Sequence, residues 1–76
     1  MAHYQIVVQW KSGEPATGRR VSLCGTGLLG GFSKDFYTDR GGRAVIEMSS
    51  GGEVTVYVDG SDRGRTRPGT YLVTIG

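Results

Sequence analysis

Arginine is the residue type in this sequence whose number and spacing best suit a binding role. Arg63, Arg65 and Arg67 alternate within a polar, glycine-containing stretch at residues 60–69. Alternate residues of an extended segment project to one side, and converging guanidinium groups bind carboxylates or phosphates. A long connection of this kind in a small domain is more often functional or mobile than structural. We therefore predict a partner-binding loop here, with an ordinary solvated loop as the alternative.

Two further groups of side chains extend this candidate surface. Arg40 and Arg43 flank a second glycine turn, and Tyr37 and Tyr57 occupy positions opposite the core-facing residues of their predicted strands. Exposed aromatic rings beside arginines are typical of recognition surfaces, although tyrosines on one sheet face also pack across strands. The candidate partner-binding residues are therefore Arg63, Arg65, Arg67, Arg40, Arg43, Tyr37 and Tyr57.

Catalytic and metal-binding groups are scarce. His3 is the single histidine and Cys24 the single cysteine, so neither a common zinc site nor a Cys–His nucleophile can be assembled. Asp39 is expected to brace its own turn through its carboxylate. The segment from Asp59 to Asp62 resembles a calcium loop only faintly, because arginine and glycine follow where oxygen ligands are needed. We expect no catalytic residue, no metal and no enzymatic activity.

A glycine pattern at residues 25–30 matches the Gly-x-Gly-x-x-Gly signature of dinucleotide sites. Such a site needs a helix that begins at the third glycine, within a βαβ unit of about 30 residues. Strand signals crowd the rest of the chain, so we interpret the pattern as an interstrand loop and expect no cofactor. Its Leu28 and Leu29 either cap the end of the domain or form an exposed contact.

Composition limits the remaining possibilities. With 76 residues the chain is long enough for one domain, residues 1–76, and one small core. The lone cysteine lacks an intramolecular partner, which favours a reducing, cytoplasmic location, although a module of a longer secreted or surface protein is the alternative. A net charge of +2 does not indicate general nucleic-acid binding, and the sequence contains no apolar run that predicts membrane insertion.

Alternation of apolar and polar residues predicts the elements that must carry these side chains. Strands are expected at residues 3–10, 20–24, 34–39, 44–48, 54–59 and 70–75, joined by glycine-containing turns. In the first strand, Trp10 is in phase with the buried residues, and in the fifth, Thr55 lies opposite them. The fold class is all-β, a small antiparallel β-sandwich of six to seven strands.

Several turns and strands together resemble the carboxypeptidase-regulatory-like, or transthyretin-like, β-sandwich domains. The resemblance rests on Ser12-Gly-Glu-Pro-Ala-Thr-Gly18, Val21 and Leu23, Thr38-Asp39 with Gly42, and Gly52-Glu-Val-Thr-Val-Tyr-Val58. It implies a seven-strand, two-sheet sandwich that serves as a scaffold, spacer or adhesion module beside another activity. It implies no catalytic residue, since the peptidase activity of those enzymes belongs to a separate zinc domain.

These observations predict a non-catalytic accessory module that interacts with another protein or belongs to a larger parent chain. A carbohydrate-binding module that uses Trp10, Tyr37 and Tyr57 is one alternative. A nucleic-acid-binding module that uses the arginine loops is another, and it would require a basic face.

Overall fold

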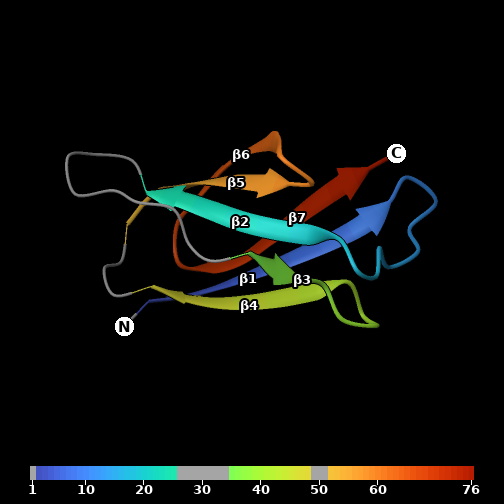
Figure 1. Cartoon of the computed structure of the whole chain (residues 1–76), viewed down its shortest axis with the longest axis horizontal. Helices are drawn as coiled ribbons and strands as arrows, with labels where there is room; N and C mark the ends of the chain where they lie inside the picture. Colours follow the sequence, from blue (N-terminus) through green and yellow to red (C-terminus); the bar gives the residue numbers. More distant parts are fainter. Residues whose placement is uncertain (1, 26–34, 49–51) are drawn as a thin grey trace.

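The structure, a computed structural model, describes residues 2–25, 35–48 and 52–76 (Figure 1). These residues form seven β-strands and no helix, so they include none that is long and apolar enough to cross a membrane. The strands are β1 (Ala2–Trp10), β2 (Arg20–Gly25), β3 (Phe36–Tyr37), β4 (Arg43–Met48), β5 (Val54–Val58), β6 (Ser61–Thr66) and β7 (Gly69–Ile75). Most of the 25–30 glycine pattern, with Leu28 and Leu29, lies outside the described residues.

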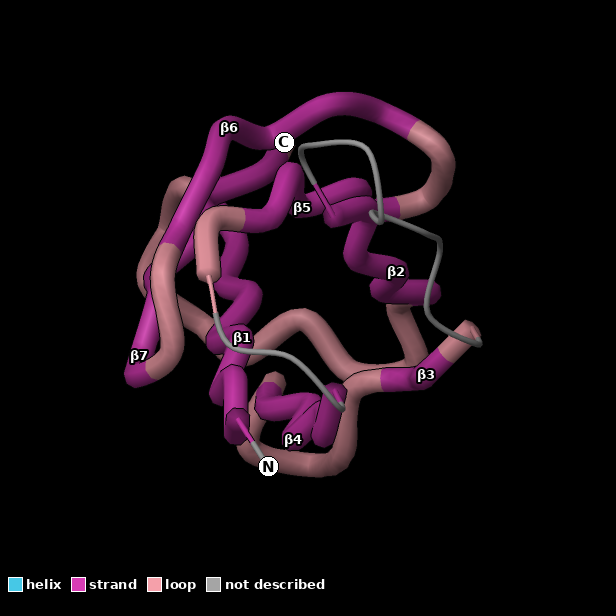
Figure 2. Tube along the Cα trace, turned by 90° about the vertical axis from the view of Figure 1, so that its left-hand side faces the viewer, coloured by secondary structure: helices cyan, strands magenta, loops and turns pink. Residues whose placement is uncertain are grey.

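Two sheets face each other across the core. One has the strand order β4-β1-β7 and the other the order β3-β2-β5-β6. Every pair is antiparallel except β1 with β7, which is parallel. Figure 2 shows the strands around a common interior, with β6 next to β7 at one side and β3 next to β4 at the other. The predicted small β-sandwich is confirmed.

The core consists of the inward-facing residues of both sheets. Alternation along β1 buries Tyr4, Ile6 and Val8, and the sequence-predicted inward residues of β2, β4, β5 and β7 are buried or half-buried as well. Among the described residues, the buried hydrophobic ones are Tyr4, Ile6, Val8, Ala16, Val21, Leu23, Ala44, Ile46, Val54, Val56, Val58, Val73 and Ile75. Because both sheets contribute β-branched residues at a period of two, the apolar faces meet without a helix.

Trp10 departs from the prediction that it is buried. It ends β1 and is 37% exposed, although Ile75, its partner on β7, is buried in the core. The guanidinium of Arg19 lies over its ring, 5.5 Å from the ring centre. The phase of the alternation is correct, but at the end of the strand the ring is covered by Arg19 and stays partly exposed.

The predicted loop at residues 60–69 is wrong. Most of this segment is strand β6, which pairs with β5, and β7 already begins at Gly69. The alternation of apolar residues is missing because β6 is an edge strand at the margin of the core. An edge strand can carry polar side chains on most positions and still form its backbone hydrogen bonds.

Two smaller predictions also need correction. The third strand is shorter than residues 34–39, since only Phe36 and Tyr37 are strand among its described residues, and Thr38 is a buried turn residue. Thr55 was expected on the polar face of β5 but is buried. It lies between Cys24 of β2 and Arg65 of β6, and on such a central strand the cross-strand neighbours on both sides limit the exposure of a small side chain.

Candidate functional site

The outer face of the four-stranded sheet carries three of the seven predicted binding residues. Tyr37 of β3 lies opposite Arg20, Tyr57 of β5 lies opposite Ser22, and Arg65 of β6 lies opposite Thr55. Cross-strand partners point to the same face of a sheet, so the two tyrosines share this outer face. Their predicted positions opposite the core are confirmed.

The two tyrosines are separated by β2. In the strand order β3-β2-β5-β6, neighbouring strands lie about 4.8 Å apart, so Tyr37 and Tyr57 are on the order of 10 Å apart across the sheet. Tyr37 is 64% exposed, whereas Tyr57 is half-buried. The rings therefore do not form a directly paired aromatic clamp.

The three alternating arginines do not project from a loop. Arg63 and Arg65 lie within β6, and Arg67 follows its end. A β-bulge interrupts the pairing with β5, because Thr55 faces Arg65 whereas Tyr57 faces Asp62. A bulge breaks the alternation of side chains, so the expected one-sided row of arginines is wrong.

Two contacts of β6 hold this strand in place within the fold. Arg65 lies 3.7 Å from the Glu53 carboxylate, and the backbone oxygen of Arg63 accepts a hydrogen bond of 2.8 Å from the Tyr71 hydroxyl. The second contact joins β6 to β7 and so connects the two sheets at their margin. The guanidinium of Arg65 remains largely exposed and available to a partner.

Arg40 and Arg43 lie elsewhere in the fold. Arg40 is in the turn after β3, and Arg43 begins β4, where it lies opposite Val7 of β1. Arg43 therefore belongs to the outer face of the three-stranded sheet, on the other side of the sandwich from Tyr57. The seven predicted residues do not form one surface.

Asp39 braces its turn, as predicted. Its Oδ1 accepts hydrogen bonds from the backbone N–H of Gly41 at 2.8 Å and of Arg43 at 3.1 Å. These backbone donors, that of Arg43 above all, lower the pKa of the Asp39 carboxyl below its ordinary value because they stabilise the ionised form. The side chain is occupied locally, with the geometry of an Asx turn.

The carboxylates of Asp59 and Asp62 also bind groups of the fold itself. Asp59 accepts the backbone N–H of Arg20 at 3.2 Å and lies 3.4 Å from the guanidinium of Arg19. Asp62 accepts the backbone N–H of Gly64 at 2.8 Å. Within the described ranges, no group of three or more potential metal-ligating side chains comes together.

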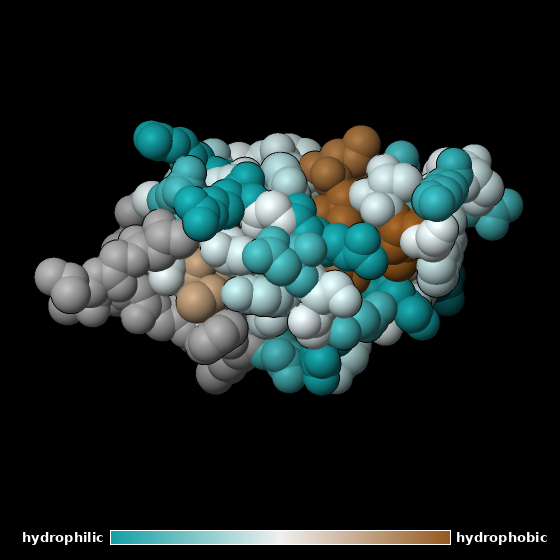
Figure 3. All heavy atoms as spheres, turned by 90° about the horizontal axis from the view of Figure 1, so that it is seen from above, coloured by the Kyte–Doolittle hydropathy of each residue, from teal (hydrophilic) through white to brown (hydrophobic). Residues whose placement is uncertain are grey.

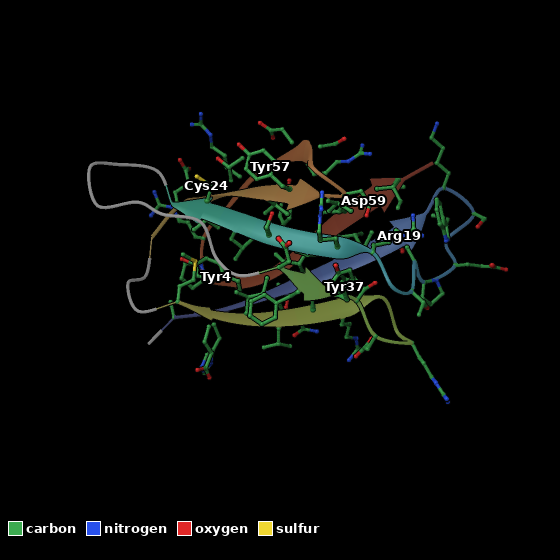
Figure 4. All side chains as sticks on the ribbon, viewed as in Figure 1. Tyr4, Arg19, Cys24, Tyr37, Tyr57 and Asp59 are labelled. Carbon is green, nitrogen blue, oxygen red and sulfur yellow. The ribbon has the colours of Figure 1, made fainter. Side chains whose placement is uncertain are left out.

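Arg19 connects this end of the sandwich to Trp10. Figure 4 shows Arg19 and Asp59 together at one end of β2 and Cys24 at the other. The guanidinium of Arg19 lies over the Trp10 ring and pairs with Asp59, a combination of cation–π and charge contact. One face of the Trp10 ring is therefore covered, which disfavours it as an open stacking platform for a sugar.

An apolar strip on the outer face of the three-stranded sheet was missed by sequence reasoning. We define it as Val7, Val45 and Leu72, one residue from each strand of that sheet. Val7 lies opposite Leu72 across β1 and β7, and Val45 lies opposite Gln5, the next outward residue of β1. Val45 is 60% exposed and Leu72 is 55% exposed.

The signal for this strip was present in the sequence. Each of its members is an apolar residue in the outward phase, between two residues in the inward phase. The view from above in Figure 3 shows hydrophobic surface gathered in one area of the face turned to the viewer, with hydrophilic side chains beside it, whereas β4 with its part of the strip lies at the bottom of Figure 1, on the far side of that view. The strip therefore rests on the exposure and register of its residues, and large exposed apolar side chains on one sheet face indicate an interaction surface.

Comparisons with known proteins add no family to this geometry. A scan against protein-family models finds no match, and a search of curated proteins finds no related sequence.

Proposed function

We propose that this chain is a non-catalytic accessory module, of the carboxypeptidase-regulatory-like type, that binds another protein or supports a larger parent chain through the outer faces of its sheets. The resemblance of its turns and strands to that family supports the proposal. So does the local use of its acidic side chains, since Asp39, Asp59 and Asp62 each accept backbone N–H groups within or beside turns.

The exposure of large side chains on flat sheet faces is the observation that carries the proposal. Tyr37 stands out from one sheet, and Val45 and Leu72 stand out from the other. Each could have been a small polar residue without any loss to the core, because none of them packs inward. Aromatic and aliphatic anchors on an otherwise polar surface are the features that protein partners use.

Nucleic-acid binding is less well supported than protein binding. Its requirement is a basic face, whereas the predicted arginines are distributed over β6, the turn after β3 and the opposite sheet. Carbohydrate binding would need an open aromatic platform, and Trp10 is covered on one side by Arg19. Both remain outcomes of the experiment below.

Paired surface variants test the proposal. The immobilised chain is used to capture proteins, and the bound proteins are compared quantitatively with those held by Tyr37→Ser and by Val45→Ser, each changed on one sheet face. We expect one of the two variants to lose a specific set of partners, while circular dichroism shows that both remain folded. The control is Thr17→Ala, an exposed change in a turn outside both sheets that removes no anchor.

Mixed-sequence DNA and RNA and a panel of oligosaccharides are measured in parallel. Binding to nucleic acid that weakens steeply with salt, or binding to a sugar, would replace the proposed function. Capture that neither variant alters would show that the outer faces are not the binding surfaces.

A further inference from the structure

The free edges of the two sheets differ in how they are protected against pairing with another strand. Among the described residues, β3, β6, β4 and β7 are the terminal strands of their sheets. Natural edge strands avoid unwanted pairing by being short, by carrying charges or by containing a bulge. Here β3 has two residues, β6 has charged side chains and a bulge, and β4 has Arg43 and Glu47.

The remaining edge strand, β7, has none of these features. Its seven residues, Gly69–Ile75, include no charge and no proline, and its pairing with β1 is regular along the whole strand. Threonine, tyrosine, valine and isoleucine all favour extended structure. The strand is therefore suited to accept another strand at its open edge.

The hydrogen-bond phase shows which groups of β7 face that edge. The backbone oxygen of Ile75 accepts a 3.0 Å hydrogen bond from Lys11, on the side of β1. Since the backbone groups of a strand point alternately to its two sides, Val73 and Tyr71 also face β1. The N–H and C=O groups of Thr70, Leu72 and Thr74 therefore point to the open edge, and these three residues are exposed.

We propose that β7 pairs antiparallel with β7 of a second copy of this chain, about a two-fold axis at Leu72, which joins the two three-stranded sheets into one sheet of six strands. Leu72 is the central residue of Gly69–Ile75. This register places Leu72 opposite Leu72 and Thr70 opposite Thr74 of the second copy. All the outward backbone groups of the strand are then used in hydrogen-bonded pairs.

The side chains of β7 are self-complementary in the same register. On the outer face, Thr70 meets Thr74 of the second copy, and Leu72 meets its own equivalent. On the inner face, Tyr71 meets Val73 of the second copy. Threonine pairs and aromatic–β-branched pairs are favourable across strands, and no like charges are brought together because the strand is uncharged. A two-fold interface requires this kind of self-complementarity.

Two members of the apolar strip, Val7 and Leu72, support a second copy as the partner. Leu72 lies beside Val7 in the register of β1 and β7. Pairing about Leu72 therefore produces an apolar row of four side chains, Val7 and Leu72 from each copy, that runs across the junction. The exposure of Leu72 in the single chain is reduced because its side chain packs against its equivalent.

Sedimentation velocity over about 10 µM to 1 mM tests the pairing, since edge pairing alone gives modest affinity. We expect the 76-residue chain to shift from monomer to dimer over this range. Leu72→Pro removes the central outward N–H and keeps the bonds to β1, and proline is tolerated on sheet edges. It should weaken dimerisation at least about tenfold. Val45→Ser, on the far strand of the same face, should leave dimerisation unchanged.

A charge exchange tests the register and does not depend on Leu72→Pro folding. One variant carries Thr70→Lys with Thr74→Lys, and the other carries Thr70→Glu with Thr74→Glu. Each alone should be monomeric over the same range, and an equimolar mixture should form a heterodimer. A wild-type chain that stays monomeric throughout would overturn the proposal. So would a dimer that Val45→Ser disrupts and the threonine variants do not, because that result indicates packing of sheet faces.

Discussion

Two bends of this protein use the same local chemistry in different surroundings. In the turn at residues 38–42, Asp39 accepts the N–H of Gly41 at 2.8 Å, and within β6, at its bulge, Asp62 accepts the N–H of Gly64 at 2.8 Å. Each bend also has a glycine with positive φ, +74° at Gly42 and +101° at Gly64. Both therefore combine an aspartate that accepts a backbone N–H two residues on with a glycine in the left-handed region.

The two bends differ in the atoms that surround their glycines. A Cβ at Gly42 would meet backbone atoms, foremost the oxygen of Val8, and the Val8 N–H donates to the Gly42 oxygen at 2.7 Å. A Cβ at Gly64 would meet the hydroxyl of Tyr71, the far end of a side chain, at 2.5 Å. The first turn is enclosed by backbone that cannot move, whereas the second lies at a sheet margin against a side chain that can. The surroundings, and not the turn motif, therefore determine how much a change costs.

The largest expected effect is that of Gly42→Ala. The added methyl group strains a left-handed backbone and displaces Val8, so we expect a loss of about 3 to 5 kcal/mol in the free energy of unfolding. Urea denaturation followed by circular dichroism measures it. Gly18→Ala is the matched control, because Gly18 has a φ of +71° with open space around it, and it should cost about 1 to 2 kcal/mol. Equal losses of unfolding free energy in the two variants would show that the backbone around Gly42 moves aside to admit the methyl group.

Thr38→Val is expected to have the next largest effect. The buried hydroxyl of Thr38 donates to the Ala16 oxygen at 2.5 Å and accepts the Arg19 N–H at 2.9 Å. Valine keeps the shape and leaves both backbone groups without this partner, which should cost about 2 to 3 kcal/mol. Thr38→Ser retains the hydroxyl and should cost only about 1 kcal/mol. Thermal unfolding that ranks the serine variant below the valine variant would contradict this.

Gly64→Ala should have a smaller effect than either change in the first turn. The Tyr71 hydroxyl can move away, so the cost is the backbone strain plus the hydrogen bond to Arg63, about 1.5 to 2.5 kcal/mol in all. Tyr71→Phe removes the hydroxyl and should partly relieve the strain of alanine. The double variant should therefore be less destabilised than the sum of the two, by about 0.5 kcal/mol or more. Strict additivity in urea denaturation would disprove the contact.

The smallest expected effect concerns the charge of Asp39. Its pKa in the folded chain is lowered from 3.8 because the N–H groups of Arg43 and Gly41 stabilise the carboxylate. Its contribution to stability is therefore present above the unfolded pKa and is lost as the pH falls through the folded pKa. Asp39→Asn keeps an acceptor without the charge. The difference in Tm between the wild type and this variant should be small at pH 7 and shrink toward pH 2. If the difference in Tm instead grew as the pH fell, the carboxylate of Asp39 would not be stabilised in the folded chain.

Most of the fold could be predicted from the sequence because the strands that build the core show a clear alternation of apolar and polar residues. Val54, Val56 and Val58 alternate with less apolar neighbours, and all three are buried. Strand β6 could not be predicted in this way, since its stability comes from backbone pairing with β5 and not from buried side chains of its own. The position of Asp39 in a bracing turn was predictable because an Asx turn is a local interaction.

The candidate surfaces were less predictable than the core. Tyr37 and Tyr57 were placed correctly on an outer face, since a period of two determines the face of a residue within one strand. The arginines were misplaced because a bulge in β6 changes the alternation, and a bulge depends on the partner strand. The apolar strip could not be predicted, because its residues come together only once β4 and β7 are known to flank β1.

By itself, the sequence determined the all-β class, the inward phase of the long strands and the glycine turns, because each follows from interactions between residues close in the chain. Only the tertiary structure decided that β7 lies parallel to β1, that Val7, Val45 and Leu72 form one strip, and that Gly42 is enclosed whereas Gly64 is not. These features join residues far apart in the sequence. Their pairing depends on which strands become neighbours when the two apolar faces close on each other, and no local pattern encodes that choice.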